Sequence, residues 1–304
     1  RGRGRRLASP PVADRARELG IALSQPESVN APDAREQIAA AGDAAARQTV
    51  VVCAFGALIK EPLLSEQELL NVHPSLLPRW RGAAPVERAI MAGDRQTGVS
   101  IMRLTAGLDS GPVCMAATEP VAPEDTYGSL APRLAALGGD LLVRVLDLAA
   151  QGQAPAFEDQ DESGVTYAEK IGPEDRLLDP SASAVHLERV VRALHPHIGA
   201  RLELDDGGFL GVHAAAVLAP AGTEAAAPAE VAARTEAAVP AEVAVRAEVA
   251  PGERLEPGVL AAREGRLLYG TVDGVLELLI VQPPGGRPMD AASFLRGHGL
   301  PAGQ

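Results

Sequence analysis

The apolar pattern of this chain changes its period once, and that change constrains the fold more than any other feature. Up to residue 150, short apolar runs alternate with segments in which apolar residues recur every three or four positions. These patterns are typical of strands and of amphipathic helices. After residue 196, apolar residues recur at every second position, which is typical of half-buried strands. We therefore expect two domains of different architecture.

The first part of the chain is predicted to be an α/β domain. Helices are expected over Pro10–Gly20, Pro32–Ala41, Ala84–Ala92 and Asp125–Ala150, and strands over Thr49–Phe55, Leu69–His73, Val99–Leu104 and Pro112–Ala117, with a short apolar run over Ile21–Leu23. The continuous apolar run Thr49–Phe55 favours a strand buried on both faces. The alternation of helices with strands indicates a mostly parallel sheet. Gly138 and Gly139 are expected to interrupt the long last helix.

The second part is predicted to be a small β-barrel of the OB type, preceded by one helix and followed by another. The helices are expected over Ala182–Leu194 and Ala291–Arg296, and the strands over Ala200–Leu204, Phe209–Leu218, Val259–Ala261, Leu267–Thr271 and Val275–Val281. The polar stretch in front of this part is rich in Pro, Gly and Asp. We therefore predict a first domain over 1–152, a linker over 153–172 and a second domain over 173–304.

One segment differs from both domains. Over residues 219–252, Glu224, Glu236 and Glu248 recur every twelve residues, and Pro and Arg residues recur with them. Three Ala/Pro/Glu-rich units of this kind bury little apolar surface, so we predict a low-complexity, disordered insertion between two strands.

Composition and charge exclude several classes of protein. No apolar run approaches the roughly 18 residues of a membrane span. Two cysteines, Cys53 and Cys114, make no disulfide framework, and the chain shows no apolar leader at its start, so a reducing, cytoplasmic setting is expected. The net charge of −12 disfavours a general nucleic-acid binder, but the first six residues, RGRGRR, contain four Arg.

The densest group of candidate functional residues lies between Asn71 and Pro85. Asn71 and His73 are separated by one residue at the end of a predicted strand, so both side chains project from the same face. An amide and an imidazole aimed at one point could stabilise an oxyanion. A lone histidine of this kind can equally be a structural residue, and the residues leave both interpretations open.

A second group, Gly107–Gly111, lies between two predicted strands. Asp109 can be a turn residue of a hairpin. It can also pair with His73, where its charge would favour the imidazolium and orient the ring. The two residues are 36 positions apart, so only the fold could bring them together.

Three stretches of the sequence, the first of which runs from Asn71 to Pro85, resemble the methionyl-tRNA formyltransferase family. His73-Pro-Ser-Leu-Leu-Pro78 is similar to a motif of all formyltetrahydrofolate-using formyltransferases, and Arg79-Trp-Arg-Gly-Ala-Ala-Pro85 is more particular to the methionyl-tRNA members. Gly107–Gly111 and Thr166–Lys170 add to the similarity, which covers almost the whole chain outside the 219–252 insertion.

The resemblance implies a Rossmann-like catalytic domain, an OB-like domain that binds tRNA, and a set of site residues. Asn71, His73 and Asp109 would be catalytic, and Arg3 and Arg5 would contact the tRNA. The folate site would include Ser75, Leu76, Leu77 and Pro78, with an apolar wall around Val52–Ile59. The implied reaction transfers the formyl group of 10-formyltetrahydrofolate to the α-amine of methionyl initiator tRNA, as a step of translation initiation.

Further expectations concern cofactors, assembly and the start of the chain. No metal is expected, because the sequence has no HExxH motif and no clustered Cys and His residues, and a monomer is expected. Family members begin with a strand, a turn, a helix and a second strand, whereas this chain opens inside the basic loop. We therefore expect the first strand–helix unit to be missing and apolar sheet edges to be exposed.

Two other functions remain open. One is formyl transfer to another amine, that of a sugar nucleotide or of glycinamide ribonucleotide. The second domain argues against the glycinamide enzyme, and the Arg79–Pro85 run argues against the sugar enzymes. The other is a tRNA-binding or folate-binding remnant without activity, against which the intact set of Asn71, His73 and Asp109 argues.

Overall fold

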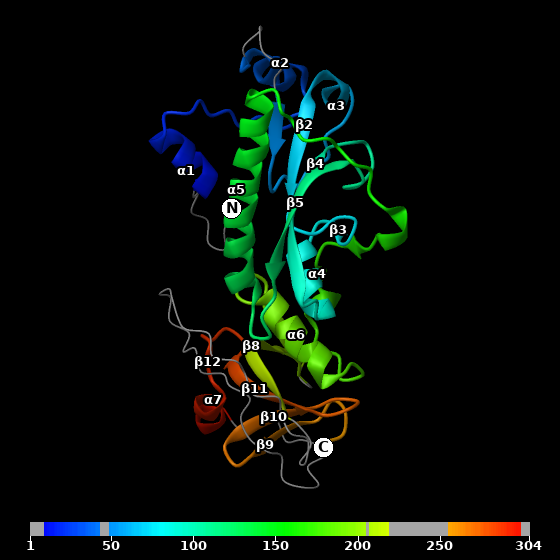
Figure 1. The fold of residues 1–304 in the computed structure, drawn as a ribbon. Helices are drawn as coiled ribbons and strands as arrows, with labels where there is room; N and C mark the ends of the chain where they lie inside the picture. The colour runs from blue at the N-terminus through cyan, green and yellow to red at the C-terminus, as the bar shows by residue number, and fades with distance from the viewer. Residues whose placement is uncertain (1–8, 43–48, 205–206, 219–254, 299–304) are drawn as a thin grey trace. The chain divides into compact units, whose positions relative to one another are not determined.

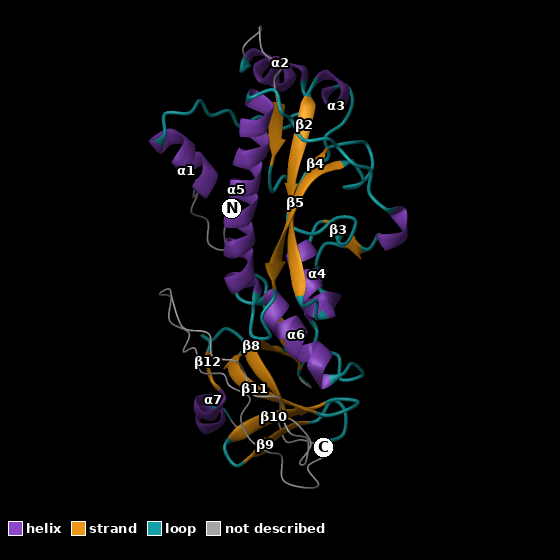
Figure 2. Cartoon of the chain, in the orientation of Figure 1, coloured by secondary structure: helices purple, strands orange, loops and turns teal. Residues whose placement is uncertain are grey.

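The structure is a computed structural model that describes residues 9–42, 49–204, 207–218 and 255–298 (Figures 1 and 2). The chain divides into two units. One comprises the residues up to Val50 together with Phe55–Leu69, and the other comprises Val51–Ala54 together with the chain from Leu70 onward. The predicted insertion at 219–252 and the basic segment at 1–6 lie outside the described residues.

The described residues of the first unit form three helices, α1 (Pro11–Glu18), α2 (Pro32–Ala40) and α3 (Leu63–Glu66). Proline suits the first position of α1 and α2 because an N–H there has no partner within the helix. Arg35 of α2 binds Glu66 of α3 through two hydrogen bonds of 3.0 Å. The predicted helices α1 and α2 are confirmed, whereas the four-residue α3 was not predicted.

A four-stranded sheet has the order β1-β2-β4-β5, and its strands are β1 (Thr49–Val52), β2 (Glu68–His73), β4 (Gln96–Arg103) and β5 (Val113–Pro120). The α/β class is confirmed, but β4 pairs antiparallel with both β2 and β5, unlike the predicted mostly parallel sheet. The reason is visible in the register: Leu70 pairs with Arg103 at the end of β4, and His73, the last residue of β2, pairs with Ser100 in the middle of β4. The connection thus begins and ends at one end of the sheet, and the chain reverses instead of crossing over.

The strand β1 differs from the strand predicted over Thr49–Phe55. It ends at Val52, and its side chains are only half-buried, with Val51 38% exposed. Among the described residues, β1 is the last strand at one side of the sheet, and the exposure of apolar sheet edges stays a prediction.

Two helices accompany the sheet, α4 (Pro85–Ala92) and α5 (Tyr127–Ala150). The long α5 packs on β4 and β5 (Figure 1). The predicted interruption at its two glycines is wrong, because α5 runs through them unbroken. Gly138 is instead needed for close packing: a Cβ atom there would lie 2.9 Å from Cγ1 of Val72.

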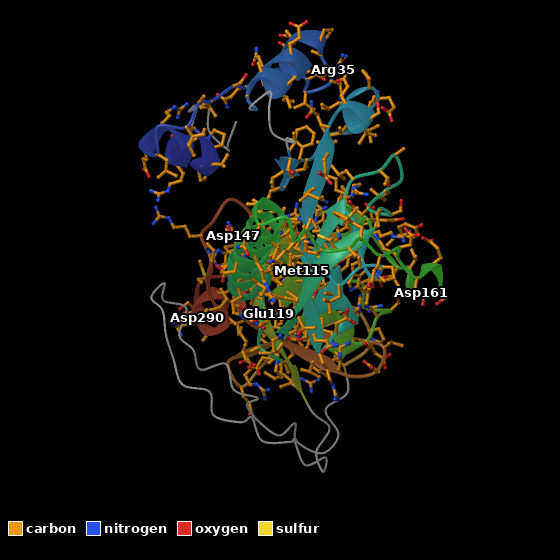
Figure 3. The ribbon with its side chains drawn as sticks, turned by 45° about the horizontal axis from the view of Figure 1, so that its top comes forward. Arg35, Met115, Glu119, Asp147, Asp161 and Asp290 are labelled. Carbon is orange, nitrogen blue, oxygen red and sulfur yellow. The ribbon has the colours of Figure 1, made fainter. Side chains whose placement is uncertain are left out.

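Residues 153–172, the predicted linker, contain structure of their own. The short strand β6 (Tyr167–Ala168) pairs in parallel with β3 (Arg81–Gly82). Between β2 and β3 lies a loop of residues 74–80, called the motif loop below. A 3-10 helix, η1 (Glu162–Gly164), precedes β6, and Asp161 caps it (Figure 3). The segment therefore returns to the loop that carries the candidate functional residues.

The C-terminal part has the predicted order of one helix, strands and one helix. The elements are α6 (Ala184–Leu194), β7 (Ala200–Glu203), β8 (Phe209–Leu218), β9 (Leu260–Arg263), β10 (Arg266–Gly270), β11 (Val275–Gln282), β12 (Met289–Asp290) and α7 (Ala291–Gly297). Asp290 caps α7 (Figure 3). The strands form an antiparallel sheet in the order β7-β8-β11-β10-β9, with β12 beside β11. The five predicted strands and both helices are confirmed, and closure into an OB-like barrel stays a prediction.

One apolar core connects the four-stranded sheet with the C-terminal strands. The cluster includes Ile101 of β4, Leu130 of α5, Leu194 of α6 and Leu276 of β11, all less than 1% exposed. The apolar face of α6 thus packs on both parts. Of the helices in the described ranges, none has the length and apolar character that a membrane crossing requires.

Candidate active site

The end of β2 presents the first two predicted residues. Asn71 pairs with Met102 and His73 with Ser100 in the adjacent strand β4, so the backbone of both is fixed by the sheet. Because side chains alternate along a strand, the two lie on one face. The His73 side chain is buried, with 4% of its surface exposed.

The fold brings Asp109 to the same place. Asp109 lies in the connection between β4 and β5, with a φ of 42° in the left-handed region. Its Oδ1 is 3.5 Å from Nδ2 of Asn71, and its Oδ2 is 3.7 Å from Nδ1 of His73. The first is a long hydrogen bond, and the second is longer than a hydrogen bond but within the range of an ion pair. An amide, an imidazole and a carboxylate therefore meet at the end of β2.

Asp109 is held in place by groups that were not predicted. The backbone N–H of Gly82 donates to Oδ2 of Asp109 at 2.9 Å. Nε2 of Gln160 donates to the carbonyls of Asp109 at 2.8 Å and Gly111 at 2.7 Å. These bonds leave Oδ1 as the less engaged oxygen of the carboxylate.

The orientation of the His73 ring follows from a single backbone group. Nε2 of His73 lies 2.9 Å from the carbonyl oxygen of Trp80, which can only accept a hydrogen bond. Nε2 therefore carries a proton, and Nδ1 is the nitrogen that faces Asp109. Trp80 reaches this position with a φ of 64°, a left-handed backbone conformation that is uncommon for a bulky residue.

The loop from Ser75 to Pro78, predicted to bind folate, is tied down from within. The buried Ser75 hydroxyl donates to the carbonyl of Arg79 at 2.6 Å. The Ser100 hydroxyl donates to the carbonyl of Ser75 at 2.8 Å and accepts from the N–H of Leu77 at 3.1 Å. The Ser75 side chain thus shapes the loop, and the predicted folate role of residues 75–78 stays a prediction.

Residues after this loop join it to β6. The Thr166 side chain accepts from the Trp80 N–H at 2.8 Å, and the buried Arg81 donates through Nε to Gln160 at 2.9 Å. Gly82 must be glycine here, because it has a φ of 123° and a Cβ atom would lie 2.6 Å from the Ala168 carbonyl oxygen. The strand pair β3–β6 therefore positions the Gly82 N–H that holds Asp109.

Other predicted residues are not placed at this site. Arg3 and Arg5 lie outside the described residues. The segment Val52–Ile59 is divided between the two units of the chain, so its role as an apolar wall of the folate site stays a prediction.

Sequence reasoning missed Gln160 and the two backbone groups of Trp80 and Gly82. Gln160 lies in a polar stretch that predicts only a linker, and nothing in its neighbours distinguishes it. Trp80 and Gly82 belong to the conspicuous 79–85 run, but a carbonyl and an N–H leave no side-chain signature. The one signal was Gly82 itself, since a glycine within such a loop is typical of close backbone approach.

Comparison with protein families gives the class of the protein. Residues 3–146 match the formyl transferase family, and residues 170–299 match the formyl transferase C-terminal domain. The chain is thus a member of the formyl transferase family.

Individual relatives narrow this class. The chain is 40% identical over 305 residues to methionyl-tRNA formyltransferase of Halorhodospira halophila. The matched residues cover 100% of this chain and 86% of the relative. It is 41% identical over 306 residues to the protein of that name in Phenylobacterium zucineum, with 100% and 87% covered. The chain therefore belongs to the methionyl-tRNA formyltransferase family.

A solved structure agrees in fold. Methionyl-tRNA formyltransferase from Clostridium thermocellum superposes with a TM-score of 0.52 and 14% identity, over 67% of this chain and 86% of that structure. A likeness at this identity concerns the fold alone.

Proposed function

We propose that this protein transfers the formyl group of 10-formyltetrahydrofolate to the α-amine of methionine esterified to initiator tRNA. The observation that carries the proposal is the meeting of Asn71, His73 and Asp109 at the end of β2. Two donors and a carboxylate around one point suit the attack of an amine on a formyl carbon. Relatives of this chain at 40% and 41% identity are named methionyl-tRNA formyltransferase.

The first step is nucleophilic addition. The α-amine attacks the formyl carbon, and its oxygen becomes an oxyanion. Within the described residues, the Asn71 side-chain amide donates only the long contact to Asp109, which leaves its second N–H for this oxygen. His73 can offer a second donor only through Nδ1, since Nε2 keeps its proton on the Trp80 carbonyl. A donor at Nδ1 exists only in the imidazolium form of the ring, and Nδ1 lies 3.7 Å from Oδ2 of the Asp109 carboxylate.

The second step moves one proton and breaks one bond. The attacking nitrogen must lose a proton, and Oδ1 of Asp109 is the oxygen with room to take it, because Oδ2 accepts from the Gly82 N–H. As the bond between the formyl carbon and N10 of the folate breaks, N10 takes up the proton that Asp109 accepted. The products are formylmethionyl-tRNA and tetrahydrofolate, and atoms and charge balance.

Binding of the two substrates is assigned to other parts of the chain. We assign folate contacts to Ser75, Leu76, Leu77 and Pro78, and tRNA contacts to Arg3 and Arg5 and to the C-terminal sheet as an OB-like domain. The catalytic domain is assigned to residues 1–152 and the tRNA-binding domain to 173–304. Replacing Arg3 and Arg5 by Ala should lower the salt dependence of tRNA use by roughly one unit of slope for each lost phosphate contact.

The test of the proposal is a formylation assay with charged initiator tRNA and 10-formyltetrahydrofolate. His73→Ala should lose on the order of 100-fold to 1000-fold in kcat. His186→Ala is the matched control, because His186 is exposed on α6, and it should behave as the parent protein. Turnover of His73→Ala at the parent rate would contradict the mechanism, and formylation of amino-sugar nucleotides in place of tRNA would favour the alternative substrate class.

A further inference from the structure

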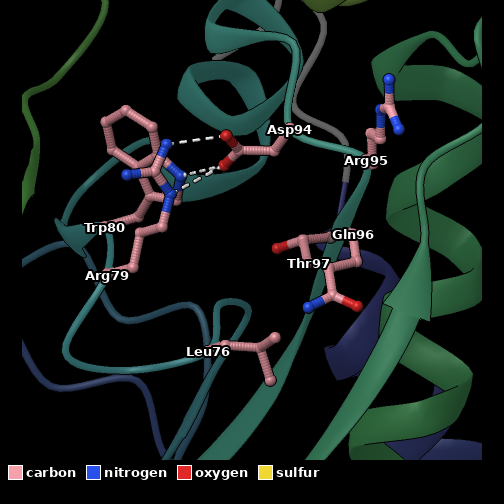
Figure 4. A pocket seen from close by; sticks show the side chains of 7 residues that line it. All are labelled: Leu76, Arg79, Trp80, Asp94, Arg95, Gln96 and Thr97. Carbon is pink, nitrogen blue, oxygen red and sulfur yellow. Dashed lines mark hydrogen bonds and ion pairs between the residues drawn. The ribbon is translucent and has the colours of Figure 1, made fainter. Parts of the chain in front are cut away.

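A pocket lies beside the motif loop that follows β2, and Leu76 is the one residue of its lining that the proposed function assigns to folate. Its volume is about 250 Å³ (Figure 4). It lies between the loop residues Leu76, Arg79 and Trp80 and a second segment, which comprises Asp94 and Arg95 in front of β4 and Gln96 and Thr97 at its start. The Leu76 side chain packs closely against Gly98 of β4: a Cβ atom on Gly98 would lie 2.5 Å from Cδ2 of Leu76. The pocket is therefore built from one loop and one strand that hold each other in place.

One wall of the pocket is a flat, rigid surface. The guanidinium carbon of Arg79 lies 4.3 Å from the centre of the Trp80 ring. Asp94 binds both side chains: it accepts from Arg79 at 2.7 and 2.9 Å and from the indole Nε1 of Trp80 at 2.8 Å (Figure 4). Stacked aromatic and guanidinium planes of this kind are surfaces on which nucleobases stack.

The side chains that line the pocket carry one more positive charge than negative charge. Asp94 neutralises Arg79, and its hydrogen bonds raise the pKa of that guanidinium above the usual value. Arg95 is exposed, and its side chain has no hydrogen-bond or ion-pair partner in the part of the chain that the structure describes. The pocket therefore offers one uncompensated positive charge.

A buried polar atom also faces the pocket. Oγ1 of Thr97 has no hydrogen-bond partner among the described residues, although the side chain is only 3% exposed. In Figure 4 this oxygen points toward the side on which Trp80 lies. A buried hydroxyl without a partner is unfavourable, so a ligand that supplies one would be stabilised there.

Trp80 connects this pocket to the candidate active site. Its ring lines the pocket, whereas its carbonyl accepts the hydrogen bond from Nε2 of His73 at 2.9 Å. A group bound in the pocket is thus adjacent in the structure to the residue that sets the orientation of the His73 ring.

We propose that this pocket binds one nucleotide of the single-stranded 3′ end of the tRNA, with its base stacked on Arg79 and Trp80 and its phosphodiester on Arg95. This inference rests on the proposed function. A phosphodiester carries one negative charge, which matches the single uncompensated charge of Arg95, whereas the glutamate tail of a folate brings two carboxylates. Gln96 and Thr97 provide hydrogen-bonding groups for the base or ribose.

The direct test is fluorescence, because Trp80 is the only tryptophan of the sequence. The probe is the RNA trinucleotide CCA, titrated against the whole chain with correction for nucleotide absorption. Stacking at Trp80 should quench its emission in a saturable, salt-sensitive way. Arg95→Gln should weaken CCA binding roughly three- to tenfold and reduce the salt slope by about one. The matched control, Arg144→Gln, removes the same charge from an exposed site on α5 and should leave the quenching unchanged.

Thr97→Val separates a binding role from a structural one. It keeps the shape of the side chain and removes the unpartnered hydroxyl, so the melting temperature should stay the same or rise while CCA binding weakens. A fall in melting temperature with unchanged CCA binding would show that the hydroxyl serves the fold and would overturn its role in the pocket.

Kinetics distinguish a failure of this inference from a failure of the proposed function. In the formylation assay, Arg95→Gln should raise the KM for methionyl-tRNA roughly three- to tenfold and leave kcat and the KM for folate unchanged. Formylation by the parent with no CCA quenching, or equal KM values for Arg95→Gln and the parent, would overturn the pocket assignment and leave the function standing. Loss of CCA binding when 10-formyltetrahydrofolate saturates the protein would also overturn it, in favour of folate. An absence of formylation would contradict the function, and the fluorescence titration would still decide the pocket.

Discussion

The carbonyl oxygen of Trp80 accepts a hydrogen bond from Nε2 of His73 at 2.9 Å, and this bond decides which nitrogen of the ring faces the reacting groups. Nδ1 is left 3.7 Å from Oδ2 of Asp109, with the Asn71 amide on the other carboxylate oxygen. A backbone group of the loop after β2 therefore orients a side chain of β2 itself. The arrangement assigns different tasks to the two oxygens of Asp109, and this can be tested.

Asp109→Asn should lower kcat on the order of 100-fold while the protein stays folded. The amide can still accept the Gly82 N–H through its oxygen, so the loop keeps its shape, but the charge beside His73 and the proton acceptor at Oδ1 are lost. Single-turnover formylation rates measure the effect. Asp147→Asn, at an exposed position of α5, is the control and should match the parent. A rate for Asp109→Asn within a few-fold of the parent would refute the proton-acceptor role.

Gln160 is expected to be a positioning residue for Asp109. Gln160→Ala removes both hydrogen bonds to the carbonyls of Asp109 and Gly111, which should lower kcat about tenfold. Gln160→Glu should be as damaging, because a carboxylate cannot donate to two carbonyls. The KM for folate and the KM for tRNA should change less than kcat. Full activity of Gln160→Glu would show that the donor is not needed.

Gly82 and Gly139 form a matched pair for stability. Gly82→Ala should destabilise the protein by about 2 kcal/mol or more, because its φ is 123° and the new Cβ atom would lie 2.6 Å from the Ala168 carbonyl. Gly139→Ala meets no atom within 4 Å on the exposed face of α5, so it should stabilise by about 0.5–1 kcal/mol. Urea unfolding measures both, and effects of the same sign would contradict the expectation.

The sequence predicted most elements but not the directions of the strands. The apolar period of Val99–Leu104 indicates a strand, yet burial on both faces is the same whether its neighbour runs parallel or antiparallel. Direction depends on where the connection ends, which the pairing of His73 with Ser100 reveals. Strand Thr49–Phe55 was predicted too long for a related reason: an apolar run shows what can be buried, and not whether a neighbouring strand covers it.

The sequence predicts those residues of the candidate site whose reactive side chains lie close together in the sequence. The spacing of Asn71 and His73 places both on one face of a strand, and the structure agrees. The partnership of Asp109 with His73 needed either the fold or a family resemblance, because 36 residues separate them. The groups that orient them, the Trp80 carbonyl and the Gly82 N–H, exist at every residue and become visible only when the backbone is placed.

The buried Asp125 should make the free energy of unfolding depend on pH. Burial opposes the ionisation of Asp125, but hydrogen bonds from Arg133, Ser129 and the Ala122 N–H outweigh it and hold its pKa below the usual value. Arg133 donates to both carboxylate oxygens, at 2.7 and 2.9 Å. A carboxylate whose pKa is lower in the folded state stabilises the fold above its unfolded pKa of about 4, and this stabilisation is lost as the pH falls through the lower, folded-state pKa.

Asp125→Asn should therefore lose about 1–3 kcal/mol of unfolding free energy at pH 7. The difference from the parent should be constant between about pH 7 and pH 5. It should shrink below about pH 4, where Asp125 becomes protonated in the unfolded parent, and the contribution of the charge should be lost below the lower, folded-state pKa. Urea unfolding at several pH values measures this, with Asp147→Asn as the exposed control. A difference between Asp125→Asn and the parent that stays the same down to pH 3 would show that shape and hydrogen bonding, and not the charge of Asp125, stabilise this site.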